Sequence, residues 1–297
     1  MLKFIKDGIL PIAMIAGALT YKWVSHLSFL TAGLIFVMLL LTFCKIRLNE
    51  IKFHTAHLWL LLIQLAGSIG IYLLLKPYNP IVAQGAMLCL LAPTATAAAI
   101  ITGMLGGNVG FLTAYTLFCN IAVAIAAPVY FSFTGTHEGM SFLQSVWLIS
   151  QKVFPLLIFP LFIAFTVQRR FPKIQKILLR IPKMSFYLWV AALTIVTGIT
   201  VDFMLHHDRT NDNTELWLLV MSFVFCCLQF YTGRKIGRHY GDAISSGQGL
   251  GQKNTILAIW MAQTYLHPLA ALAPAGYILW QNIINSYQLF RRQSGSL

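Results

Sequence analysis

Two short polar interruptions decide the fold of this chain, residues 92–96 (APTAT) and 249–255 (GLGQKNT). Each lies inside a stretch that is otherwise apolar enough for the interior of a membrane. Non-helical backbone is tolerated at that depth only where protein or a water-filled cavity satisfies its polar groups. The interruptions fall at matching places in the two halves of the chain, a pattern typical of transporters built from repeats.

The composition of the 297 residues excludes a water-soluble globule. Hydrophobic residues make up 58% of the chain and charged residues only 10%, too few to cover a soluble surface. All five cysteines fall in apolar segments without the spacing of metal ligands, which indicates small core residues. The sequence therefore predicts an all-α membrane protein with the lipid bilayer as its main solvent.

Ten apolar segments remain when the chain is cut at its charged and turn-rich points. Each is near the roughly 20 residues that a helix needs to cross about 30 Å of hydrocarbon. They run approximately over residues 8–24, 27–44, 55–75, 81–105, 108–131, 149–168, 184–205, 215–232, 243–266 and 268–290. The first lacks a cleavage site of small residues, so we expect it to remain in the protein.

The basic residues give these spans an orientation. With a cytoplasmic N-terminus, 16 of the 21 lysines and arginines fall on the cytoplasmic side, as the positive-inside rule requires. We therefore expect a multi-pass protein of the cell (inner) membrane with both termini in the cytoplasm. Because the basic residues are divided among separate loops, the net charge of +13 does not predict nucleic-acid binding.

The ten spans divide into two repeats of five, residues 1–140 and 141–297. An odd number of spans per repeat makes the second repeat insert upside down relative to the first. The interrupted segments are the fourth member of each repeat, spans four and nine. The predicted fold is thus a 5+5 inverted-topology repeat of ten transmembrane helices.

The first interruption contains a proline. Pro93 removes a backbone donor, and we expect Thr94 or Thr96 to cap a second half-helix that begins at Ala97.

The second interruption is rich in glycine. Gly247, Gly249 and Gly251 are expected to weaken the helix, and Asn254 or Thr255 to cap its continuation. Each break then turns the positive end of a half-helix towards the middle of the membrane, where two such ends favour an anion.

One ionisable residue lies at the breaks. Lys253 is ten residues into its span, about 15 Å at 1.5 Å per residue, and so can lie near the bilayer centre. Ordinary glycine and proline kinks between packed helices are the alternative explanation of the breaks. Such kinks do not explain a lysine at membrane depth, where ionisable residues are functional by default.

Several motifs resemble one family. Residues 93–99 (PTATAAA) followed by 107–109 (GNV) are similar to the Pro-Gly-Gly-Thr-Ala-Ser-Asn and Gly-Asn-Val of the bile acid:sodium symporter family. Residues 254–258 (NTILA) resemble the Gln-Asn-Ser-Gly-Leu-Ala of that family's ninth helix, and Gln64 falls where its third helix carries a glutamine.

The resemblance implies a panel domain of spans one, two, six and seven beside a core domain of spans three to five and eight to ten, in which broken helices 4 and 9 cross. Members of the family carry organic anions, usually driven by sodium. Thr96 and Asn254 match the family's substrate residues, and we expect Thr94 and Thr255 beside them to bind substrate as well. We therefore expect a carrier of a small organic anion that works by alternating access at the crossing.

The chain departs from the family at the sodium sites. The positions that supply sodium ligands in the family are occupied here by Ala98, Ala99, Leu112 and Gly249. Thr116 and Gln64 remain as oxygen donors. Because sodium is a hard cation that needs several oxygens, conventional sodium coupling is not expected.

Lys253 offers a replacement for sodium. When the ninth-helix motifs are aligned on Asn254, Lys253 takes the place of the family's glutamine, and we hypothesise that it acts as a fixed countercharge or as a proton carrier. Aligned on Gln252 instead, Lys253 is an insertion. It would then face the cavity as a substrate anchor, or bind a carbonyl and only hold the break together.

Other classes of function remain as alternatives. A conventional sodium:organic-anion symporter is the first, and a non-transporting membrane sensor or scaffold is the second. An enzyme is not expected, because the chain has no His-Glu-x-x-His, no Gly-x-Ser-x-Gly and no carboxylate at a break. No cofactor or bound metal is expected either.

Overall fold

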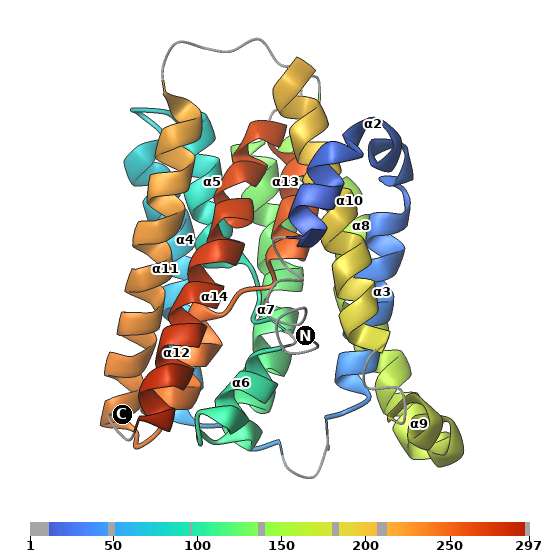
Figure 1. Ribbon diagram of the computed structural model, residues 1–297, viewed down its shortest axis with the longest axis vertical. Coiled ribbons are helices and arrows are strands. Elements are labelled where there is room, and N and C mark those ends of the chain that lie inside the picture. The colour runs from blue at the N-terminus through green and yellow to red at the C-terminus, as the bar shows by residue number, and fades with distance from the viewer. Residues whose placement is uncertain are drawn as a thin grey trace. The chain divides into compact units, whose positions relative to one another are not determined.

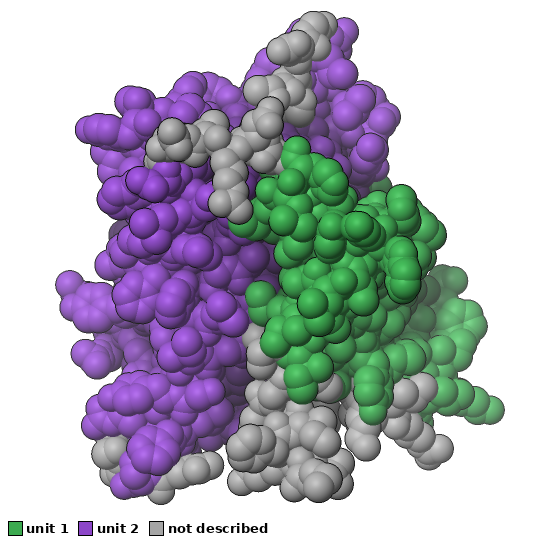
Figure 2. Space-filling model, turned by 45° about the horizontal axis from the view of Figure 1, so that its top comes forward, with its two compact units in different colours: residues 1–46, 155–211 green, residues 47–154, 212–297 purple. Residues whose placement is uncertain are grey.

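The computed structural model describes residues 12–46, 51–95, 97–135, 140–179, 184–206 and 213–294. These ranges are mostly helical and contain no named strand, which confirms the predicted all-α class (Figure 1). The chain forms two compact units (Figure 2). Unit 1 comprises residues 1–46 and 155–211, and unit 2 comprises residues 47–154 and 212–297.

Unit 1 contains the first and the middle helices of the chain. Residues 12–19 are helical, and the further elements are α2 (Tyr21–Val24), η1 (Ser25–Leu27), α3 (Leu30–Phe43), the later part of α8 (Phe142–Arg170), α9 (Pro172–Leu179) and α10 (Met184–His206). The chain bends by 66° between residues 21–27 and α3, a few residues after the predicted boundary between spans one and two at residues 25–26.

Glutamines complete the end of α3. The carboxamide nitrogens of Gln168 and Gln175 donate to the carbonyl oxygens of Phe43 and Cys44, at 3.0 Å in each case. Since the last carbonyls of a helix have no partner within the helix, these two side chains supply what the backbone lacks.

Unit 2 contains both interrupted helices. Its elements are α4 (Thr55–Leu75), α5 (Pro80–Leu91), α6 (Ala98–Met104), α7 (Val109–Thr134), the first part of α8, α11 (Thr214–His239), α12 (Ala243–Gly251), α13 (Thr255–Tyr265), η3 (Pro268–Ala271) and α14 (Leu272–Gln293). Figure 1 places α5 and α13 in one half of this unit and α6 and α12 in the other.

Five of the described helices are long and apolar enough to cross a membrane, namely α4, α7, α8, Phe186–His206 of α10, and α11. A sixth is added if residues 21–27 and α3 form one bent span. The remaining predicted spans are not long apolar helices. At 12, 9 and 11 residues, α5, α12 and α13 are too short, and α14, although 22 residues long, is more polar. Ten spans therefore stay a prediction, whereas the apolar helices are those of an integral membrane protein.

Both predicted breaks occur, with some details changed. The first separates Leu91 from Ala98, and the second separates Gly251 from Thr255. The prediction that Thr94 caps α6 is wrong, because the residue before α6 is Ala97 and no side chain caps it. Thr96, the other predicted cap, lies outside the described residues.

The glycines of the second break have a different role from the predicted one. The helix does not weaken there, since α12 continues through Gly251. Instead the glycines permit close packing. A Cβ atom on Gly249 would lie 2.8 Å from Cδ1 of Tyr115, and one on Gly251 would collide with the ring of Phe230.

Candidate functional site

The two breaks are joined directly to each other. Thr94 and Lys253 form an isolated antiparallel bridge. Around it, the amide of Ala95 donates to the carbonyl oxygen of Gln252 at 2.8 Å, and the amide of Asn254 donates to that of Pro93 at 2.7 Å. Each break thus satisfies backbone groups of the other, which non-helical backbone requires at membrane depth.

Gln64 of α4 donates hydrogen bonds to the carbonyl groups at the end of α5. Its nitrogen donates to the carbonyl oxygens of Leu91 and Ala92, at 2.8 and 3.0 Å. Its oxygen accepts from the hydroxyl of Tyr115 at 2.7 Å and from the thiol of Cys119 at 3.1 Å. A carboxamide has two N–H donors and two acceptor lone pairs, so these four bonds occupy Gln64 completely.

Lys253 also binds the end of α5. Its ammonium nitrogen lies 2.8 Å from the carbonyl oxygen of Leu90, and its side chain is only 1% exposed. Its backbone amide donates to Oε1 of Gln281 at 2.9 Å. The C-terminal end of a helix carries partial negative charge, which favours a cation at this place.

No carboxylate accompanies this lysine in the described part of the chain. The salt bridge among the described residues joins His206 and Asp202, which belong to unit 1. An ammonium has three N–H donors, whereas among the described residues the nitrogen of Lys253 has one hydrogen-bond partner, the carbonyl oxygen of Leu90. This contact with a carbonyl is the one expected of a lysine that holds the break together.

The last carbonyl groups of α12 accept hydrogen bonds from the opposite break and from α14. The hydroxyl of Thr94 donates to the carbonyl oxygen of Gly249 at 2.8 Å, and that of Tyr277 donates to Gly251 at 2.7 Å. Gln229 of α11 links the two helix ends, because its nitrogen donates to the carbonyl oxygen of Cys89 at 3.1 Å and to the Tyr277 hydroxyl at 3.0 Å.

The predicted substrate residues are buried at this junction. Thr94 is fully buried, Thr255 is 5% exposed and Asn254 is 9% exposed. Oδ1 of Asn254 accepts from the amide of Leu257 at 3.3 Å, which confirms its predicted capping of α13. Thr96 lies outside the described residues, and Oε1 of Gln252 is buried without a partner among the described ones.

The predicted sodium positions do not fit a sodium ion. Tyr115 fills the space beside Gly249, and Ala98 and Leu112 are fully buried apolar residues. The hydroxyl of Thr116 donates to the carbonyl oxygen of Leu112 at 2.9 Å. With Gln64 fully bonded, these side chains do not provide the several oxygens that such a cation needs.

Sequence reasoning did not identify Gln229, Tyr115, Tyr277 and Gln281 as parts of the site. A similar spacing of Gln and Tyr in the two halves of the chain could have revealed three of them. Gln64 and Tyr115 are 51 residues apart and hydrogen-bonded, and Gln229 and Tyr277 are 48 residues apart and hydrogen-bonded. Each pair comes from the helix before and the helix after a broken one.

Long apolar helices with two joined breaks define the class as an integral membrane protein with the features of a transporter. The model of the Sodium Bile acid symporter family matches residues 31–207, which is 177 of the 297 residues. The chain belongs to this family, as its motifs had indicated. The matched range includes the first break and ends before the second.

No curated protein matches the chain in a sequence comparison. The family is one of transporters rather than enzymes.

Proposed function

We propose that the protein is a secondary transporter of a small organic anion, in which Lys253 replaces the usual sodium. Transport would occur by alternating access where broken helices 4 and 9 (α5–α6 and α12–α13) cross, and would be sodium-independent or coupled to protons. The observation that carries this proposal is the position of Lys253, whose ammonium lies at the junction of the two breaks without a carboxylate among the described residues.

The charges around the breaks favour an anion. The N-terminal ends of α6 and α13 carry partial positive charge, and Lys253 adds a full positive charge between the breaks. A carboxylate or sulfate would balance this charge, whereas a cationic substrate would find no described acidic side chain there.

The packing argues against a bound sodium ion. A glutamate at position 249 would need the space that the Tyr115 ring takes, and Gln64 has no free lone pair. The second candidate is a conventional sodium symporter, and the name of the family favours it.

The same proposal includes the architecture. Unit 1 would be the panel and unit 2 the core, made from a 5+5 inverted repeat with both termini in the cytoplasm of an inner-membrane protein. The duplicated pairs Gln64–Tyr115 and Gln229–Tyr277 support the repeat.

Thermal unfolding of the purified protein tests the function. A ligand that binds only the native state raises the midpoint by mass action, so a panel of organic anions in sodium and in choline buffer reports substrate class and ion requirement together. We expect stabilisation by an anion that is equal in both buffers and is lost in Lys253→Gln.

Lys152→Gln is the matched control, because Lys152 is an exposed lysine of α8. It should keep the full anion response. Stabilisation that requires sodium would establish the conventional symporter, and a full response in Lys253→Gln would remove the lysine from the mechanism.

A further inference from the structure

Four buried amide side chains lie together on one side of the second break. They are Gln281, Asn285 and Gln288 of α14 and Gln248 of α12, here called the amide track. Positions 281, 285 and 288 are spaced by four and three residues and so share one face of α14. All four side chains are at least 92% buried, because their exposures are 6%, 3%, 8% and 1%.

The amide track begins at the lysine of the break. Gln281 accepts the hydrogen bond of the Lys253 amide at 2.9 Å. One turn further along α14, Oδ1 of Asn285 accepts from Nε2 of Gln248 at 2.9 Å, and Oε1 of Gln288 accepts from the same nitrogen at 3.0 Å. From Gln281 to Gln288 the track rises about 10 Å along the helix axis.

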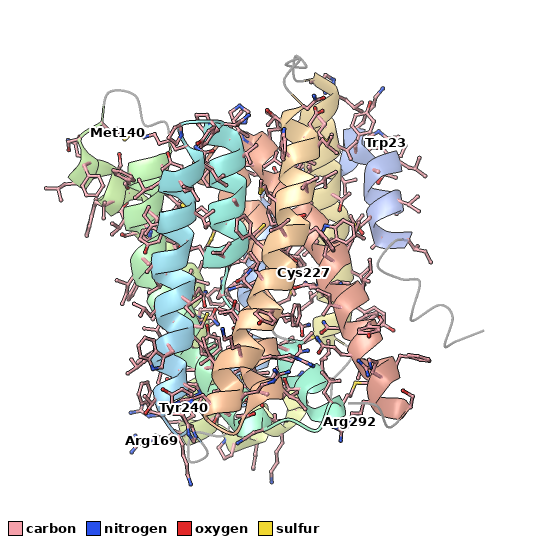
Figure 3. The ribbon with its side chains drawn as sticks, turned by 90° about the vertical axis from the view of Figure 1, so that its left-hand side faces the viewer. Trp23, Met140, Arg169, Cys227, Tyr240 and Arg292 are labelled. Atoms are coloured by element: carbon pink, nitrogen blue, oxygen red, sulfur yellow. The ribbon has the colours of Figure 1, made fainter. Side chains whose placement is uncertain are left out.

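The track runs towards the end of unit 2 where α12 begins and α14 finishes, and its last member, Gln288, lies five residues before the end of α14. Figure 3 places Tyr240 and Arg292, which flank these two helix ends, at one end of unit 2 and Met140 at the opposite end. The amides therefore extend from the junction of the breaks towards the end of unit 2 that carries Tyr240 and Arg292.

The hydrogen bonds within the track are incomplete. Oε1 of Gln248 and Nδ2 of Asn285 are buried without a partner among the described residues. Turning the amides over exchanges donors for acceptors, yet still leaves one atom of Gln248 and one of Asn285 unsatisfied. Buried polar groups are normally paired with protein or with ordered water, so these atoms need water molecules.

At the first break, the described positions equivalent to Gln281, Asn285 and Gln248 carry no amides. If Tyr115 and Tyr277 are equivalent, then Cys119 and Val123 correspond to Gln281 and Asn285. Likewise Leu88 stands three residues before the end of α5, as Gln248 does in α12. Cys119, Val123 and Leu88 are fully buried. The track is therefore not repeated at these equivalent positions of the first break, and a row of buried amides is costly in a membrane unless it has a use.

We propose that the amide track is a water-filled path inside unit 2, which connects Lys253 with the aqueous phase at the end where α12 begins and α14 finishes. Its ligands are water molecules held by the carboxamides. Along such a file of water, protons reach the lysine from one side of the membrane without passing through lipid. The hydration follows from the track itself, and only its use for proton exchange rests on the proposed function.

Thiol labelling in membranes tests the hydration. A water-soluble methanethiosulfonate reacts with thiolates in contact with water, and mass spectrometry of the peptide that carries the new cysteine lets the native cysteines stay in place. We expect Asn285→Cys to be labelled at least about tenfold faster than the equivalent Val123→Cys, and only when the reagent is on one side of the membrane. Equal rates, or labelling of Asn285→Cys from both sides, would overturn the proposal.

A second labelling experiment tests whether the track leads to the lysine. Lys253→Cys should be labelled from the same side as Asn285→Cys. Adding Asn285→Leu, which fills the track with an apolar side chain of similar size, should slow that labelling at least about tenfold. Adding Asn282→Leu should not, because Asn282 donates to its own helix at Ile278 and lies off the track.

If Lys253→Cys were labelled at the same rate with and without Asn285→Leu, the proposed connection between the track and the lysine would be overturned. Neither experiment needs a substrate. Labelling as expected without any anion response would therefore retain the track and reject the proposed transport.

Discussion

The two breaks differ in what they supply to each other. The first, residues 92–97, carries no charge and depends on side chains from elsewhere, since Gln64, Gln229 and Lys253 all donate to carbonyls at the end of α5. The second, residues 252–254, brings its own ammonium and its own helix cap in Asn254. Each break donates to the other, the first through the hydroxyl of Thr94 and the amide of Ala95 and the second through the ammonium of Lys253 and the amide of Asn254. Only the second donates a charged group, so the two form a complementary pair rather than two copies of one motif.

The largest expected effect is at the first break. Gln64→Leu removes both donors to Leu91 and Ala92 and leaves two buried carbonyls unpaired, which should destabilise the protein by about 3 kcal/mol. Thermal unfolding in detergent measures this loss. Gln151→Leu, at an exposed position of α8, should change stability little, and an equal loss in both variants would contradict the assigned role of Gln64.

A smaller loss is expected where the second break packs on α7. Gly249→Ala places a methyl group 2.8 Å from the Tyr115 ring and should cost about 2 kcal/mol. Gly70→Ala is the matched control, because a Cβ there meets nothing within 4 Å and should stabilise α4 by about 0.5 to 1 kcal/mol. Combining Gly249→Ala with Tyr115→Leu should recover part of the loss, and strict additivity would refute the contact.

Loss of the helix cap at the second break is expected to destabilise the protein less than the two substitutions above. Asn254→Ala should cost about 1 kcal/mol, because it removes the oxygen that accepts from the amide of Leu257. Asn254→Asp retains an acceptor and should lose less stability than Asn254→Ala in the same unfolding measurement. If the two substitutions were equivalent, the cap would not contribute.

The smallest effect is expected at the corresponding position of the first break. Ala97 precedes α6 with φ −76° and ψ −16°, which are helical values, whereas a capping residue needs an extended backbone. Ala97→Ser should therefore change the free energy of unfolding by less than about 0.5 kcal/mol. A gain of the size expected for a cap would mean that the two breaks begin their second half-helices in the same way.

Features that depend on local chemistry could be predicted from the sequence. A proline and a cluster of polar residues within apolar stretches predicted both breaks, and the apolar run of residues 55–75 coincides with α4. Asn254 was predicted as a cap because capping needs only the next few residues. The match to the family model then confirmed the resemblance that the motifs around residues 93–109 had indicated.

Features that depend on distant residues were missed. Thr94 was expected to cap its own half-helix, but its hydroxyl donates to Gly249, 155 residues away. Glycines that lower helix propensity in isolation are tolerated in α12 because the rings of Tyr115 and Phe230 occupy the space they leave. Local rules carry no information about which ring or carbonyl another helix will present.

The long-range bonds of the first break also bear on how the protein is made. The ammonium that binds the carbonyl oxygen of Leu90 comes from a residue 163 positions later in the chain. The carbonyl oxygen of Pro93 likewise accepts from the amide of Asn254, which is synthesised much later. While the ribosome is still synthesising the second half, the inserted end of α5 has only Gln64 of α4 as its partner from this set. Bare carbonyls are costly in hydrocarbon, so the first half must keep that end hydrated or shielded until the final helices arrive. Assembly of unit 2 is therefore completed only after synthesis of the second break.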